Sequence, residues 1–249
     1  METEIKLNRA VAKKVLETVD AGLVKGLGTA EPGKMCVEAA VNYALGLPHG
    51  DNPKCVGSLV RDFKIALNDS YWPSGKERTK GMRKLAVAQL GSDTLDQHVF
   101  LEKVGFRCMT KVLPVILENA VKEDKDNDFV KKNVDLKAFK SVIKELKAAK
   151  TFGEAKEASK KARKIYSASA YAYDSASASA YASAYAYAYA SAYASAYAYD
   201  YAYAYAYDYA KKNQTFSLKV LNLIAKQGLD TLIEMKSPGC KWLDLCDAK

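Results

Sequence analysis

Residues 7–27 read LNRAVAKKVLETVDAGLVKGL, and their apolar side chains recur at intervals of three and four. This is the period of an amphipathic α-helix, which buries one face and leaves the other in water. The same spacing returns in six further stretches, and glycine or proline separates several of them, as at the ends of helices. These stretches are residues 35–47, 56–68, 78–90, 93–108, 135–150 and 216–235. The sequence therefore predicts a mainly α-helical protein, built as a single helical domain.

Local signals refine this prediction in three places. A helix over residues 109–121 should be kinked or divided at Pro114, because proline lacks a backbone donor. Residues 122–128 are rich in Lys, Asp and Glu and should form a charged loop. Thr151 and Glu154 have the spacing of a capping box, which predicts that another helix begins there.

A long alternating tract sets this chain apart. Over residues 167–209 every odd position is Ser or Tyr, and every even position is Ala except at Asp174, Asp200 and Asp208. Fifteen of the 17 tyrosines lie between residues 166 and 209. The tract therefore combines low complexity with a large aromatic area and little charge, whereas most low-complexity segments are polar.

The tract has two incompatible structural interpretations. A period of two matches a β-strand or a β-solenoid repeat, and tyrosine favours strands. A helix is favoured by the high alanine content, by the helical segments on both sides, and by the lack of Gly, Pro or Asn to turn strands. We expect a helix, with the strand kept as the alternative. The chain then divides into a helical core over residues 1–165, a repeat over residues 166–210, and a C-terminal helix and tail over residues 211–249 that pack on the core.

Composition and charge limit the classes of protein that fit. The chain has 249 residues, 38 Lys and Arg against 29 Asp and Glu, and a net charge of +9. Its uncharged stretches are too polar or too short for a membrane span, and its N-terminus lacks the features of a signal peptide. We therefore expect a cytoplasmic protein with no membrane partner, whose five scattered cysteines are reduced.

One cluster of residues could carry thiol chemistry. Cys36 should lie in the first turn of its helix, where backbone amides and the helix dipole lower the pKa of a thiol. His49 could then act as its base and Asp51 could orient the imidazole, as Cys/His catalysis requires. The three residues form a candidate catalytic site.

The same segment also allows a metal site. Cys36, His49, Asp51 and Cys55 could hold zinc, although they lack the close CxxC pair of common zinc sites. A third interpretation is structural, with Cys36 and Cys55 as small buried side chains and His49 bracing a loop. Apart from this zinc alternative, the sequence predicts no cofactor.

The tyrosines suggest an interaction surface. Large amphipathic side chains with few charges among them have the composition of interface cores. We therefore expect a homo-oligomer or a protein partner, with a non-enzymatic interaction or assembly function as the leading hypothesis. The residues assigned to this surface are Tyr185, Tyr187, Tyr189, Tyr193, Tyr197, Tyr199, Tyr201, Tyr203, Tyr205 and Tyr207.

Basic residues before the repeat suggest another partner. Residues 122–165 hold 14 Lys or Arg against 8 Asp or Glu, and residues 137–147 carry a stripe of lysines. Such a surface can bind nucleic acid or another polyanion through its phosphates. The residues assigned to this binding are Lys160, Lys161, Arg163 and Lys164.

Several strings resemble an uncharacterised family of bacterial and phage proteins. They are GKMCVEAAVNYALGLPHGDNPKCV at residues 33–56, FKIALND at 63–69, LAVAQLG at 85–91 and SPGCKWL at 237–243. The resemblance covers most of the chain outside residues 122–210. It implies one shared architecture with an alanine-rich tract at the equivalent place, which favours a helix over a strand. It transfers no catalytic role.

Overall fold

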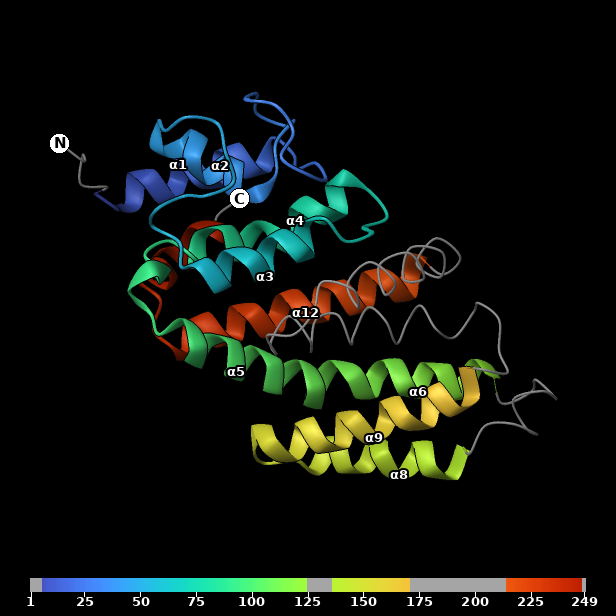
Figure 1. Ribbon diagram of the computed structural model, residues 1–249. Coiled ribbons are helices and arrows are strands. Elements are labelled where there is room, and N and C mark those ends of the chain that lie inside the picture. The colour runs from blue at the N-terminus through green and yellow to red at the C-terminus, as the bar shows by residue number, and fades with distance from the viewer. Residues whose placement is uncertain (1–5, 125–135, 171–213, 248–249) are drawn as a thin grey trace. The chain divides into compact units, whose positions relative to one another are not determined.

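The structure is a computed structural model, and it describes residues 6–124, 136–170 and 214–247 (Figure 1). These described residues form nine α-helices and no β-strand, which confirms the mainly helical class. The chain separates by its contacts into two compact units, residues 1–101 with 217–249, and residues 102–216. The sequence predicts one helical domain with an inserted repeat, because apolar spacing identifies helices without telling which of them pack together.

The first unit is built on helix-to-helix contacts near the N-terminus. Helix α1 packs on α2 and α4, and α2 and α4 both contact α3. A 3-10 segment near the C-terminus, η3, packs back on α1 and α4, and its Trp242 is buried. The elements of this unit are α1 (Arg9–Asp20), α2 (Val37–Leu45), α3 (Ser58–Asn68), α4 (Gly75–Ala88), η1 (Ser92–Thr94), most of α12 (Gln214–Glu234) and η3 (Pro238–Cys246).

Helix α1 is shorter than the sequence predicts. It begins after Asn8, whose side chain accepts a hydrogen bond from Val11 N at 3.0 Å, and it ends at Asp20 rather than near residue 27. Leu23 is nevertheless buried, because its backbone forms a bridge with Met35 in the following loop. The apolar spacing therefore continues past the end of the helix.

The second unit contains a long helical rod and a helical hairpin. The rod consists of α5 (Gln97–Arg107), which begins in the first unit, a π-helical turn η2 (Cys108–Val112) and α6 (Leu113–Asp124). The hairpin consists of α8 (Leu136–Ala148) and α9 (Phe152–Ala170), which pack on one another, and both contact the π-helical turn.

The rod differs from the sequence-based expectation in two ways. The interruption expected at Pro114 lies just before it, as the π-helical turn, and Pro114 is the second residue of α6, where a missing backbone donor is tolerated. The charged loop expected over residues 122–128 is partly wrong, because α6 continues to Asp124. The rest of that segment lies outside the described residues.

The capping box before α9 is confirmed. Glu154 N donates to Thr151 Oγ1 at 3.2 Å, and Thr151 N donates back to Glu154 Oε2 at 3.2 Å. Hydrogen bonds from the backbone amides of Lys150 and Thr151 hold the pKa of Glu154 below its usual value. The helix that begins there reaches Ala170, the fourth residue of the alternating tract. The remainder of the tract, including all ten tyrosines of the predicted interaction surface, lies outside the described residues.

The sequence also predicts that no segment of the chain spans a membrane. Within the parts of the chain that the structure describes, no helix combines the length and the apolar character needed to cross a membrane.

Helix α12 approaches α3 closely at Gly228, and this contact yields a prediction. An alanine Cβ at position 228 would lie 2.4 Å from Cε1 of Phe63, so the ring would have to move. We expect Gly228→Ala to lower the free energy of unfolding by about 1–3 kcal/mol, although alanine is the better helix former. Urea unfolding followed by circular dichroism measures the change.

The matched control is Gly50→Ala in the same unit. Its Cβ would come no closer than 3.8 Å to a neighbouring atom, Nδ2 of Asn42. We expect a change within about 0.5 kcal/mol, as for an ordinary surface substitution. If Gly228→Ala were as stable as the control, the packing of α12 on α3 would be wrong.

Candidate functional site

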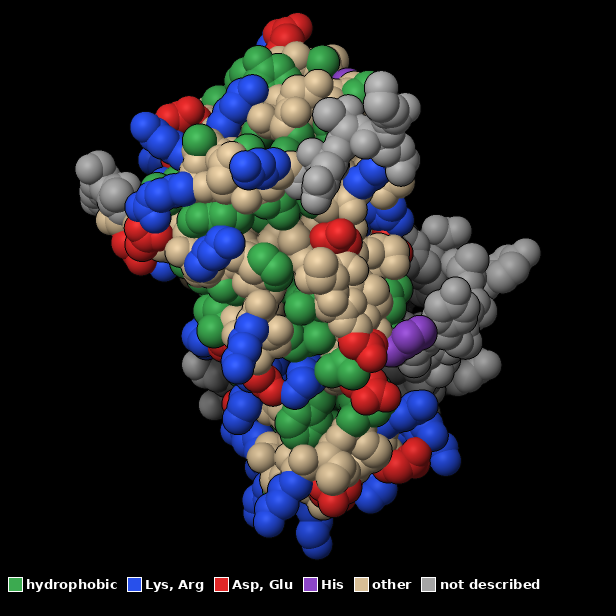
Figure 2. Space-filling view, turned by 90° about the vertical axis from the view of Figure 1, so that its left-hand side faces the viewer, with side chains coloured by type: hydrophobic (Ala, Val, Ile, Leu, Met, Phe, Trp, Pro, Cys, Tyr) green, Lys and Arg blue, Asp and Glu red, His purple; other side chains and the backbone are tan. Residues whose placement is uncertain are grey.

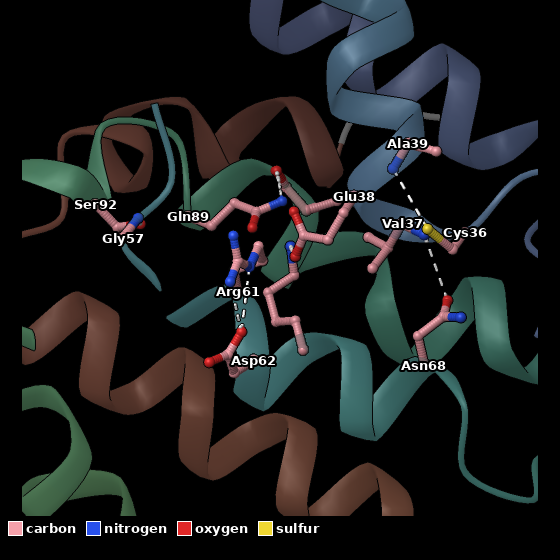
Figure 3. Close-up of polar contacts among 12 residues, drawn as sticks. Cys36, Val37, Glu38, Ala39, Gly57, Arg61, Asp62, Asn68, Gln89 and Ser92 are labelled. Atoms are coloured by element: carbon pink, nitrogen blue, oxygen red, sulfur yellow. Dashed lines mark hydrogen bonds and ion pairs between the residues drawn. The ribbon is translucent and has the colours of Figure 1, made fainter. Parts of the chain in front are cut away.

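A pair of opposite charges lies inside the first unit. Glu38 follows the first residue of α2, Lys64 lies in α3, and both side chains are fully buried, with 0% exposure. Lys64 Nζ is 2.9 Å from Glu38 Oε1. The two atoms are at ion-pair distance, but they are not aligned as a hydrogen bond. Figure 3 shows Gln89 and Arg61 reaching toward Glu38.

The surrounding sequence explains why these charges are buried. Helix α2 is buried on nearly all sides over residues 37–42, so a side chain at position 38 has no route to solvent. On α3, Lys64 follows Val60 by four residues and precedes Leu67 by three, which places it on the buried face of that helix. Apolar spacing could thus have identified Lys64 as buried, but it gives no sign of the partner.

Burial and charge act in opposite directions on this pair. Loss of water raises the pKa of Glu38 and lowers the pKa of Lys64, and in both cases this is the larger effect. The charge of each partner opposes the shift of the other, and Arg61 also favours ionised Glu38. Loss of water therefore favours the neutral forms of both side chains, whereas the contact between them favours the charged forms.

Other buried polar side chains surround the pair and connect loops to helices. Asn42 Nδ2 donates to the carbonyl oxygen of Gly50 at 2.8 Å, and Asn68 Nδ2 donates to that of Val24 at 2.9 Å. Gln89, at the C-terminal end of α4, is fully buried; its Nε2 donates to the carbonyl oxygen of Ala86 at 3.5 Å, and its side chain lies beside Glu38 (Figure 3). The cluster thus joins α2, α3 and α4 and the two loops between α1 and α3.

The chemistry open to this cluster follows from its burial. A substrate needs a path to a reacting group, whereas Glu38 and Lys64 have no exposed surface. A buried ion pair adds little net stability compared with apolar residues, but it penalises every arrangement that separates its partners. The cluster is therefore suited to fixing how α2 and α3 pack.

Cys36 occupies the predicted position at the start of its helix, but its burial opposes the predicted lowering of its pKa. It is the N-cap of α2, and its Sγ accepts a hydrogen bond from Ala39 N at 3.4 Å. It is buried, and burial raises the pKa of the thiol despite the backbone amides of Ala39 and Glu38 that lower it. The expected lowering of this pKa is wrong, because loss of water outweighs the helix terminus.

The other residues of the candidate thiol and zinc sites are differently placed. His49 is exposed, with Nε2 3.2 Å from the carbonyl oxygen of Gly28, and Asp51 is exposed as well. Cys55 is buried, which raises its pKa to about 11. Among the described residues, which include all four predicted zinc ligands, no three His, Cys, Asp or Glu side chains meet in a way that could hold a metal ion.

The predicted polyanion site lies on α9. Lys160, Lys161 and Lys164 are exposed there, whereas the side chain of Arg163 lies outside the described part of the chain. Lys160 pairs with Glu157 and Lys161 with Glu145 of α8, each at 2.7 Å. Lysine and arginine side chains are plentiful at the lower end of Figure 2, where α8 and α9 lie.

Comparison with protein families, with curated proteins and with solved structures finds no match for this chain. The resemblance of residues 33–56 and 237–243 to a bacterial and phage family therefore stays a prediction. The function must be inferred from the side chains of this protein itself.

The buried pair yields a pH-dependent prediction. Lys64→Met should lower the free energy of unfolding by about 3–5 kcal/mol at neutral pH, because it leaves Glu38 buried without a partner. Without Lys64, the pKa of Glu38 in the folded state lies still further above its unfolded value. The free energy of unfolding of this variant is therefore highest at a pH below about 4.3, the pKa of glutamate in the unfolded chain. It falls as the pH rises from there toward the pKa of Glu38 in the folded protein. Urea unfolding at acidic and at alkaline pH measures this loss.

The control for this prediction is the double variant Glu38→Gln/Lys64→Met. It has no titrating group in the pair, so its stability should change less with pH than that of Lys64→Met. The same pH dependence in both variants would show that Glu38 does not titrate as its burial requires.

Thiol reactivity provides a separate prediction. Cys240 is only partly buried, whereas Cys36 and Cys108 are buried. Burial raises the pKa of all three, to about 11 for Cys240 and about 12 for Cys108. Titration of the native protein with a chromogenic disulfide reagent should be slow, with Cys240 reacting first.

A Cys240→Ser variant should lose this first-reacting thiol, and unfolding in urea should make the remaining four accessible together. A fast reaction of Cys36 in the native protein would contradict its burial and support the catalytic interpretation.

Proposed function

We propose that this protein is a non-enzymatic interaction or assembly protein that uses its tyrosine-rich repeat as a contact surface. The composition of the repeat carries the proposal. Fifteen tyrosines lie between residues 166 and 209, together with three acids and no base. Tyrosine is enriched in the buried parts of interfaces because it offers a large rigid contact area with one polar end, while charged residues are depleted there.

The placement of the repeat in the chain supports the same proposal. It begins within the last residues of α9, which reaches Ala170, and it ends shortly before α12, which begins at Gln214. An insertion at such a place adds surface to a protein without changing the order of its other helices. We infer that the partner is a second copy of this chain, since alternating Tyr and Ala offer the same surface to each copy.

The thiol-dependent enzyme is the weaker alternative. Its nucleophile would be Cys36, whose burial raises the pKa of the thiol, whereas a catalytic thiol is activated by a lowered pKa. The proposed contact surface does not require an activated thiol.

Light scattering coupled to size-exclusion chromatography tests the proposal. The wild-type chain has a mass of 27.3 kDa, and we expect particles with a multiple of this mass. A variant in which the ten tyrosines of residues 185–207 are changed to serine should have a lower mass, because it loses most of the aromatic contact area.

A matched control leaves the tyrosines in place. Ser175→Ala/Ser177→Ala/Ser179→Ala changes the same tract without altering its aromatic content, and should assemble like the wild type. Circular dichroism would verify that all three proteins remain helical. A wild-type protein that stays monomeric at every concentration would overturn self-assembly through the repeat.

A further inference from the structure

Helix α8 separates its apolar and basic side chains onto opposite sides. Phe139 and Leu146 belong to its buried face, which packs on α6 and on the π-helical turn. Lys137, Lys140 and Lys144 are exposed and lie about 100–180° around the helix from that face, at 100° per residue. These three lysines form one row that points away from the core of the second unit.

Helix α9 repeats this arrangement beside α8. Its buried residues include Ala155 and Ala162, and it also packs on the π-helical turn. Lys160 and Lys164 are exposed on its opposite side. Both helices therefore direct exposed lysines away from the turn on which they pack.

The two rows are held next to one another. A link of only three residues connects α8 to α9, and the helices pack side by side as an antiparallel hairpin (Figure 1). Lys161 of α9 pairs with Glu145 of α8 at 2.7 Å across the seam. The hairpin face is our name for the five exposed lysines that these two helices direct away from the π-helical turn: Lys137, Lys140, Lys144, Lys160 and Lys164.

The acids of the hairpin are already engaged. Residues 136–165 contain ten Lys or Arg and three Glu, a net charge of +7 (10 − 3). Glu145 pairs with Lys161, Glu157 pairs with Lys160, and Glu154 accepts hydrogen bonds from the backbone amides that cap α9. The lysine row of α8 therefore keeps an excess of positive charge at the surface.

We propose that the hairpin face binds the phosphate backbone of nucleic acid without reading base sequence. Lysine binds phosphate as a flexible point charge, whereas bidentate readout of bases is typical of arginine. Rows of lysines one helical turn apart can each follow a line of phosphates, and release of counterions from those phosphates drives binding.

The geometry favours nucleic acid over a membrane surface as the polyanion. A helix that lies on a bilayer inserts its apolar face among the lipids. In α8 and α9 the apolar faces are already buried within the hairpin and against the rod. Only charge remains for binding, which suits a strongly charged polymer. This inference is independent of the tyrosine repeat.

Fluorescence anisotropy with a labelled duplex DNA, over a series of salt concentrations, tests the proposal. The wild type should bind, with log Kobs falling linearly as log salt rises. In Lys137→Gln/Lys140→Gln/Lys144→Gln the slope should become shallower by about 2.7, because each phosphate contact contributes about 0.9. A single strand of the same length forms a second arm, in which the expected change is about 2.1, or about 0.7 per contact.

A control variant separates this face from overall charge. Lys76→Gln/Lys80→Gln/Lys219→Gln removes three exposed lysines from α4 and α12 and lowers the net charge by the same amount. It should keep the slope of the wild type.

Three results would overturn the proposal. They are a wild type that does not bind either DNA at low salt, equal loss of slope in both triple variants, and binding to vesicles of anionic phospholipid without binding to DNA. Circular dichroism should show that both variants remain folded, since all six changes are at exposed positions.

Discussion

The contact between Glu38 and Lys64 is the constraint on which the first unit depends. Apolar contacts are non-directional, so two helices held by them alone tolerate small shifts. A charge in the interior does not, because a turn of α3 by one residue, about 100°, would carry Lys64 away from its partner. The amides of Asn42 and Asn68 then tie the neighbouring loops to the helices that this pair has aligned.

The two units use charge in opposite ways. In the first unit, buried polar groups are directed at one another and at the backbone, and the thiol of Cys36 is enclosed with them. In the second unit, the hairpin keeps its apolar residues inside and directs lysines outward. The interior of the first unit therefore serves its own packing, whereas the hairpin carries its charge at its surface.

Much of the fold could be predicted from the sequence, but little of the candidate site could. Periodicity placed α2, α3, α4, α8 and α12 within three residues of their ends, since one-sided burial leaves a direct trace in the order of residues. It extended α1 too far, because Leu23 is buried by a backbone bridge to Met35 rather than by a helix. Periodicity also placed Cys36 at a helix start, but the pKa of its thiol depends on burial by other segments. For the same reason no local pattern pairs Glu38 with Lys64.

The π-helical turn between α5 and α6 has a consequence for how this chain can change in length. Such a turn accommodates more residues than an α-helical one, so it sets the angular phase of everything that follows it. Removing one residue from 108–112 would let this turn close as an α-helical one, with α6 near its present phase relative to α5. Ile116 and Leu117 would then stay buried. The same deletion within α5 would instead rotate every residue that follows it in the rod by about 100°.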